Sequence, residues 1–292
     1  MRSRALTGVA RPLDFGYAGN LWIAAAAVGT FLAVLLWFGL AADKAPDWLG
    51  GDWISAAGAA ALAGLGTFLA WAIGRELEPD RPAAAVLASL LAIAGMLVLG
   101  PPGIGACFVV LLAVRVLNRT TGVPATPPDG VLLLGLGVWI ALDGGWIYVA
   151  APCAALLGDG LLARELRRFV WALAGAVASF GLLYVLGGPE VPLAAASSPE
   201  AAVVAVLAAL LLLPTMRGAG DVQSVGDAGG RPLEPVRVRA GQALALGVGV
   251  VAAIERGFAG LEMLMPLWAA VLASGLYGWL PGGAEPTERG TR

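Results

Sequence analysis

The stretch NLWIAAAAVGTFLAVLLWFGLAA, from Asn20 to Ala42, is long, apolar and free of charged side chains. About 20 consecutive apolar residues are enough for a helix to cross the hydrocarbon core of a bilayer. A cleaved signal peptide has an apolar core of only about 7–15 residues, so this block is too long for one. The stretch therefore predicts a transmembrane helix.

The rest of the chain repeats this pattern. Apolar residues make up 59% of the sequence and charged residues 13%, whereas a soluble domain has about 45–50% and about 25%. The apolar residues form long blocks, unlike the short alternating segments of a membrane β-barrel. We therefore expect an all-α fold, that of a polytopic helical membrane protein whose main partner is the lipid bilayer.

Several functional classes are excluded by residues that are absent. The chain has no histidine, which excludes bis-histidine haem, zinc sites that need histidine, and Ser–His or Cys–His nucleophile pairs. The net charge is −2, and no strongly basic face suggests a nucleic-acid partner. Cys107 and Cys153 lie in apolar blocks and are interpreted as packing residues. No metal site is predicted.

Charged or Pro/Gly-rich breaks divide the chain into ten candidate spans. Two of these breaks, Asp143-Gly144-Gly145 and Gly100-Pro101-Pro102-Gly103, have the composition of tight turns. Spans 104–117, 130–142 and 240–254 are short enough that full crossing needs a separate test. The candidate spans are 20–42, 53–73, 83–99, 104–117, 130–142, 146–162, 169–187, 200–215, 240–254 and 261–280.

The basic residues give this threading an orientation. Cytoplasmic loops of membrane proteins carry an excess of lysine and arginine. With a cytoplasmic N-terminus, only Lys44 and Arg256 face outward, whereas a single span from Val131 to Leu157 would divide the basic residues almost evenly. We therefore expect about ten transmembrane helices with both the N- and C-termini cytoplasmic. The inward residues are Arg2, Arg4, Arg11, Arg75, Arg81, Arg115, Arg119, Arg164, Arg167, Arg168, Arg217, Arg231, Arg237, Arg239, Arg289 and Arg292.

The domain organisation is simple. We expect one transmembrane helical domain over residues 1–280 and a disordered cytoplasmic tail over 281–292. All but one of the basic residues are arginine, and alanine and glycine are abundant. That composition is typical of GC-rich prokaryotic genomes, so the expected location is the plasma membrane of a prokaryote.

Polar residues that could bind a ligand gather in the predicted cytoplasmic segment 115–129. Arg115, Asn118, Arg119 and Thr120 could grip a phosphate or a lipid headgroup. The alternative, which we favour, is a rigid turn whose prolines and threonines cap the flanking helices.

Asp159 is the most unusual single residue, because ionisable side chains inside membrane segments often serve a function. The glycines on either side could open the helix, and Arg164 is near enough in sequence to pair with the carboxylate. The simpler interpretation, which we favour, is that the helix ends in water at this point.

A third candidate lies in the loop GDVQSVGDAGGRPLEPVRVR, residues 220–239. Asp221, Asp227 and Arg231-Pro232 resemble the Asp-rich loop of the UbiA-like prenyltransferase superfamily, where aspartates hold Mg²⁺ and a prenyl diphosphate. The family's Asn-Asp pair and close aspartate spacing are missing here, so membership does not follow. The favoured alternative is a flexible, solvated loop in which Arg237 and Arg239 fix the orientation of the next helix.

Three functions fit these observations. The first, favoured from architecture, is a permease or flippase-like carrier for a small or amphipathic solute, without cofactor and without ion coupling, because no carboxylate falls at a predicted midplane. The second is a membrane-embedded transferase on a lipid-linked, prenyl diphosphate-like substrate, using Mg²⁺ with Asp221, Asp227, Glu76, Asp80 and Arg231. The third is a non-catalytic subunit or scaffold of a membrane complex.

Overall fold

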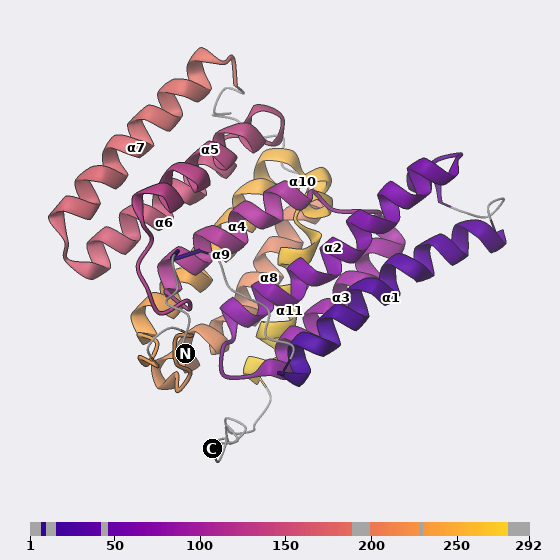
Figure 1. Ribbon diagram of the computed structural model, residues 1–292, viewed down its shortest axis with the longest axis horizontal. Helices are drawn as coiled ribbons and strands as arrows, with labels where there is room; N and C mark the ends of the chain where they lie inside the picture. Colours follow the sequence, from indigo (N-terminus) through magenta and orange to yellow (C-terminus); the bar gives the residue numbers. More distant parts are fainter. Residues whose placement is uncertain (1–6, 10–15, 42–45, 189–198, 228–229, 280–292) are drawn as a thin grey trace.

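The computed structural model describes residues 7–9, 16–41, 46–188, 199–227 and 230–279, and these are helices joined by short turns, with no β-strand (Figure 1). The predicted tail over 281–292 lies outside the described residues. The helices are α1 (Ala18–Ala41), α2 (Trp53–Leu77), α3 (Pro82–Leu99), α4 (Ile104–Asn118), α5 (Pro127–Gly144), α6 (Ile147–Ala163), α7 (Leu166–Val185), α8 (Pro199–Gly218), α9 (Pro235–Arg256), α10 (Phe258–Met263) and α11 (Met265–Trp279), with 3-10 turns η2 (Asp47–Leu49) and η3 (Ala219–Asp221).

Each of the ten predicted spans coincides with a helix in the described residues. Five helices, α1, α2, α3, α7 and α9, are long and apolar enough to cross a membrane. The span predicted over 261–280 is wrong in one respect, because the helix is interrupted at Leu264 and divides into α10 and α11. Pro266, two residues after Leu264, has no backbone N–H to donate, which explains why a continuous helix does not form there.

The predicted turns are confirmed. Helix α5 ends at Gly144 and α6 begins at Ile147. Gly145 between them has a φ of 106°, a conformation that residues with a side chain rarely adopt. Gly100 has a φ of 87° and ends α3 in the same way. These glycines allow consecutive helices to reverse direction within two to four residues.

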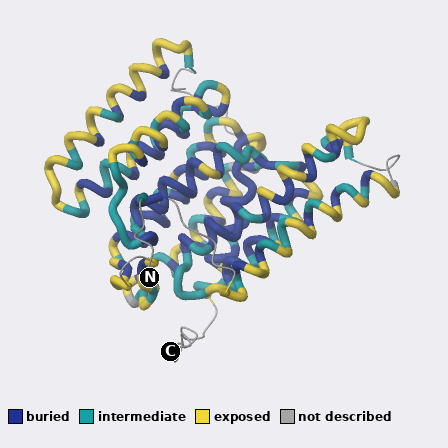
Figure 2. Tube along the Cα trace, viewed as in Figure 1, coloured by how far each residue is buried: buried dark blue, intermediate teal, exposed yellow. Residues whose placement is uncertain are grey.

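The core of the bundle is formed by α2, α4, α9 and α11. Helix α2 packs against α1, α3, α4 and α11, and α4 packs against α6 and α9. Figure 2 shows buried residues concentrated along these central helices, while α1 and α7 at the two ends of the bundle are exposed along their outer faces. Apolar outer faces of this kind suit contact with lipid.

Small residues allow some of these helices to approach very closely. A Cβ added at Gly278 of α11 would lie 2.3 Å from Thr215 Oγ1 of α8, and one at Gly275 would lie 2.7 Å from Leu211 Cγ. Close contact through glycine is common between helices in membranes. Helices α8 and α11 are thereby held together beside the polar end of the bundle.

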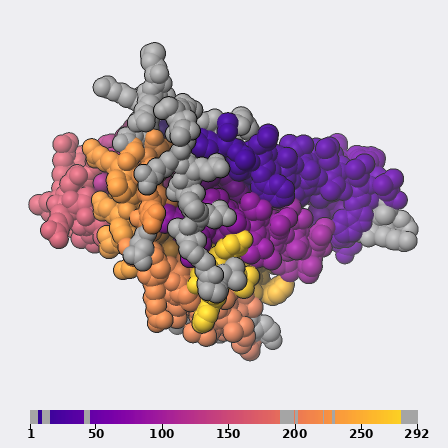
Figure 3. Space-filling view, turned by 90° about the horizontal axis from the view of Figure 1, so that it is seen from below, coloured from indigo at the N-terminus to yellow at the C-terminus, as the bar shows by residue number. Residues whose placement is uncertain are grey.

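One end of the bundle gathers the described N-terminal residues, the helix turns predicted to be cytoplasmic, and the end of α11. The Gly8 N–H donates to Asp129 at 2.9 Å, and Arg81 donates to the Tyr277 carbonyl at 2.5 Å. Figure 3 looks onto this end and shows the orange segment that contains residues 216–239 between α7 and the α1–α3 region. We call this end of the bundle the arginine-rich face, because five arginines lie there: Arg81, Arg115, Arg119, Arg168 and Arg237.

Candidate functional site

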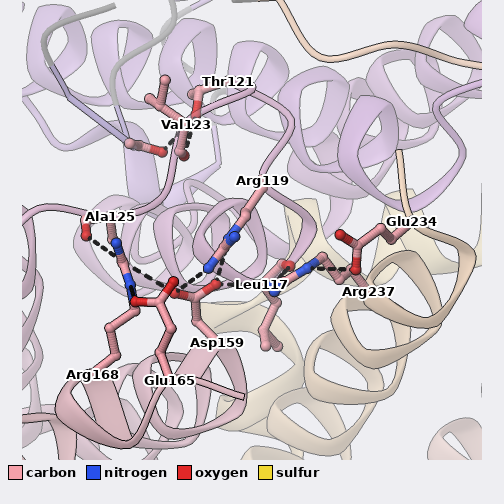
Figure 4. Close-up of polar contacts among 11 residues, drawn as sticks. Leu117, Arg119, Thr121, Val123, Ala125, Asp159, Glu165, Arg168, Glu234 and Arg237 are labelled. Atoms are coloured by element: carbon pink, nitrogen blue, oxygen red, sulfur yellow. Dashed lines mark hydrogen bonds and ion pairs between the residues drawn. The ribbon is translucent and has the colours of Figure 1, made fainter. Parts of the chain in front are cut away.

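Asp159 is the centre of a buried ionic cluster that joins four helices (Figure 4). Its side chain comes from the last turn of α6, and the residue is only 3% exposed. Arg119 donates to both carboxylate oxygens, at 2.7 and 3.1 Å, and Arg237 of α9 donates at 2.8 Å. Arg168 of α7 forms a longer ion pair at 3.8 Å. We call these residues the Asp159 cluster.

The favoured expectation for Asp159 was therefore wrong. Helix α6 continues through Gly158-Asp159-Gly160 to Ala163, and the carboxylate lies in the protein rather than in water. Arg164, the partner suggested by sequence, is exposed at the end of the helix and forms none of these ion pairs. The two glycines permit close packing: a Cβ at Gly160 would lie 2.8 Å from the Phe169 nitrogen.

The outer members of the Asp159 cluster have further partners. Arg237, which is 2% exposed, also donates to Glu234 at 3.0 Å and to the Leu117 carbonyl at 3.2 Å. Arg168 donates to Glu165 and to the Ala125 carbonyl. Three arginines thus face three carboxylates, so the cluster is electrically balanced. Arg237 was expected only to fix helix orientation, and its burial shows that it also joins α9 to α6.

A second cluster surrounds Glu76 at the end of α2. Glu76 is fully buried and accepts hydrogen bonds from Arg115 at 2.9 Å and from the Thr120 hydroxyl at 2.7 Å. Asn118 donates to the Glu76 carbonyl at 2.8 Å. Sequence analysis placed Glu76 in a loop beyond its span, but α2 extends to Leu77 and brings the side chain inside the bundle.

These contacts show which partner each polar side chain of segment 115–121 binds. Arg115 points to Glu76 and Arg119 to Asp159, so the two guanidinium groups serve different carboxylates. The Thr121 hydroxyl donates to the Gly8 and Val123 carbonyls. The segment therefore holds the bundle together, and its donors are engaged within the protein.

The loop over 220–239 was expected to be flexible and solvated, but its described residues are fixed by several contacts. The Asp80 carboxylate accepts from the backbone N–H groups of Gln223 and Ser224, at 2.9 and 2.8 Å. Val225 and Pro232 form an isolated antiparallel bridge. The Asp227 N–H donates to the Thr120 carbonyl at 3.0 Å. The loop is thus attached to both the α2–α3 turn and the α4–α5 turn.

The other residues named for a transferase on a prenyl diphosphate-like substrate have separate contacts. Asp221 ends the turn η3, and the Arg231 carbonyl accepts from the Gly226 N–H at 2.8 Å. Of the carboxylates named for that hypothesis, only Asp80 lines the cavity described next. In the part of the chain that the structure describes, no group of three or more Cys, Asp or Glu residues could hold a metal ion.

A cavity of about 290 Å³ opens at the arginine-rich face, where the α2–α3 turn meets the ends of α8 and α11. We call it the α2–α8 cavity. Its size is near the lower end of the range for small-molecule sites. The residues that line it are Glu78, Asp80, Arg81, Pro214, Thr215, Gly218, Gln223 and Gly278.

The polar groups of this cavity differ in how they are held. Arg81 donates to the Tyr277 carbonyl, Thr215 donates to the Ser274 carbonyl at 2.7 Å, and Asp80 accepts from the loop. Burial raises the pKa of Glu78 to about 7, with Arg81 opposing the rise and Asp80 adding to it. A carboxyl group of this kind changes its charge near neutral pH.

A second, apolar cavity of about 120 Å³ lies between α1, α2 and α3 on the other side of the bundle. Thr30, Trp37, Trp48 and Met96 are among the residues that line it. It offers a single hydroxyl among apolar side chains, so it lacks the groups that would orient a polar ligand.

Sequence analysis did not single out Glu78, Thr215 or Gln223 as site residues. The signal available for Glu78 was the segment RELEPDRP, residues 75–82, in which Glu78 and Asp80 stand on either side of Pro79. Its convergence with α8, α11 and the 220–239 loop depends on tertiary packing. Comparisons with protein-family models, with curated proteins and with solved structures found no match to this chain.

Proposed function

We propose that this protein is a permease-like carrier in the plasma membrane of a prokaryote and that the α2–α8 cavity holds its solute. In this proposal ten helices, α1 to α9 and α11, all cross the bilayer, and the arginine-rich face is cytoplasmic. The observation that carries the proposal is the cavity, which combines charged and hydroxyl groups with room for a solute. At about 30 Å³ per water molecule, the cavity of about 290 Å³ has room for about ten waters, or for a solute of similar size.

Features of α8 support a carrier rather than a static binding protein. Pro214 lies inside α8, at the cavity wall, and a proline in a helix removes a hydrogen bond and favours a bend. Near this proline, α8 meets α11 through Gly275 and Gly278, so the two helices are in close contact beside the cavity. The last turn of α8 is therefore suited to open and close the cavity.

Uptake into proteoliposomes tests this proposal. Four radiolabelled solutes, ethanolamine, alanine, glycerol and lactate, represent a cation, a zwitterion, a neutral molecule and an anion. We expect at least one to accumulate by counterflow, and Gln223→Trp, which fills the cavity from its exposed edge, to reduce that rate about tenfold. Gln223→Ala is the matched control and should retain the rate. If no solute exceeds the protein-free vesicles, the carrier proposal is wrong.

A transferase on a lipid-linked diphosphate is the second candidate, because Glu78, Asp80 and Arg81 share one wall of the cavity. Two carboxylates and a substrate diphosphate would suit Mg²⁺, which keeps several water ligands, and an arginine would assist the leaving group. Titration with geranyl diphosphate, with and without Mg²⁺, separates the two candidates. Binding that requires Mg²⁺ and is lost in Asp80→Asn favours the transferase, and no binding in either condition argues against it.

A further inference from the structure

Glu78 differs from the other charged side chains that line the α2–α8 cavity in how its carboxylate is held. Asp80 accepts two backbone hydrogen bonds, and Arg81 donates to the Tyr277 carbonyl. Among the described residues, the Glu78 carboxylate forms no hydrogen bond or ion pair, although it lies half-buried at the cavity wall. A half-buried carboxylate without such a partner is available to accept hydrogen bonds from a ligand in the cavity.

The charges of the residues that line the cavity indicate which class of ligand it would bind. Glu78 and Asp80 contribute two negative charges and Arg81 one positive charge, while α8, α11 and the 222–227 segment line the wall with uncharged residues only. We propose that this cavity binds a small organic cation, with the Glu78 carboxylate as its counter-ion. This inference names the substrate class for the proposed carrier function and rests on that function.

Hydrogen-bonding capacity favours a primary ammonium group over other ligands. An ammonium group has three N–H donors, and the free Glu78 carboxylate offers acceptors for them. Arg81 and Thr215 each donate to a backbone carbonyl, and the two carboxylates of Glu78 and Asp80 at the cavity wall would repel an anion. Pro214, Gly218 and Gly278 provide apolar surface for a short alkyl chain.

The same geometry makes cation binding depend on pH. Because burial raises the pKa of Glu78 to about 7, a proton competes with the cation for the carboxylate. About 90% of this carboxyl is ionised at pH 8 and about 3% at pH 5.5, so the apparent Kd should rise about 30-fold between these values. An alkylammonium group stays charged throughout, because its pKa is near the value of about 10.4 for lysine.

Calorimetric titration of the full-length protein in lipid nanodiscs tests the inference. The probes are pentylamine, pentanol and pentanoate, which have similar size and carry a positive, a zero and a negative charge. At pH 8 we expect pentylamine to bind at least tenfold more tightly than the other two, and about 30-fold more weakly at pH 5.5. Glu78→Gln should bind all three weakly and without pH dependence, whereas Glu78→Asp should retain the pH dependence. Glu262→Gln, a half-buried glutamate at the opposite face, is the control and should behave as the wild type.

Each other outcome overturns the inference. Equal or tighter binding of pentanol or pentanoate, unchanged pentylamine binding in Glu78→Gln, or no binding of any probe by the wild type would each rule out a cation site at Glu78. The uptake measurement in proteoliposomes tests the carrier function separately from cation binding. If pentylamine binds as expected but no cation accumulates in proteoliposomes, the cation site stands and the carrier function fails.

Discussion

Replacing Asp159 by asparagine should destabilise the protein substantially, because its carboxylate is the shared partner of Arg119, Arg168 and Arg237. Asparagine keeps the shape but carries no charge, and its amide nitrogen would face a guanidinium group. Removing one partner of a buried ion pair costs about 3–5 kcal/mol. The side chains of Arg119 and Arg168 are 22% and 31% exposed and can be partly solvated, whereas that of Arg237 at 2% cannot. We therefore expect a loss near the lower limit, about 3 kcal/mol.

Thermal unfolding in detergent, followed by tryptophan fluorescence, measures this loss. At about 2 °C or more per kcal/mol for a chain of this size, Tm should fall by about 6 °C or more. Glu165→Gln removes the charge of a side chain in the same cluster that is 51% exposed, and it should lower Tm by no more than about 2 °C. Combining Asp159→Asn with Arg237→Met should cost less than the sum of the single changes, because the buried arginine is then absent. A Tm for Asp159→Asn within 1 °C of the wild type would refute the reasoning.

Three further predictions follow from individual contacts. Gly241→Ala should lower Tm, because its Cβ would lie 2.1 Å from Asn118 Oδ1, whereas Gly247→Ala on the same helix meets nothing within 4 Å and should leave Tm unchanged or raise it. Asp80→Ala should speed amide hydrogen exchange in the 222–225 segment, measured by mass spectrometry, and protection equal to that of the wild type would show that the carboxylate does not hold the loop. The raised pKa of Glu78 favours its protonated form in the folded state, so its contribution to stability is present below pH 4.5 and is lost as pH rises through about 7. Glu78→Gln should therefore raise Tm relative to the wild type at pH 8 but not at pH 4, and an equal difference at both values would contradict this assignment.

The helices could be predicted from sequence because each carries its own local signal. Apolar length defined the spans, and the glycines at 144–145 and 100–103 defined the turns. The errors lie at helix ends: Glu76 was placed in a loop, but α2 extends past it because Arg115 and Thr120 satisfy its charge. The interruption at Leu264 was missed although Pro266 was a visible signal for it.

The candidate site was harder to predict, because its contacts join residues far apart in the chain. Asp159 was recognised as unusual, but spacing suggested Arg164, whereas the actual partners come from α4, α7 and α9. Sequence spacing identifies neighbours on one helix and carries no information about which helix ends meet. The α2–α8 cavity has the same origin, since four separate segments form its wall.

Thiol accessibility on either side of α6 tests most directly the claim that the short helices cross the membrane and that the arginine-rich face is cytoplasmic. The measurement uses single cysteines at Asp143 and Arg164 in a background where Cys107 and Cys153 are alanine. A membrane-impermeant maleimide is applied to intact cells and to permeabilised cells. The account predicts that Asp143→Cys reacts in intact cells and that Arg164→Cys reacts only after permeabilisation. Reaction of both positions from the same side, or the reverse pattern, would contradict it.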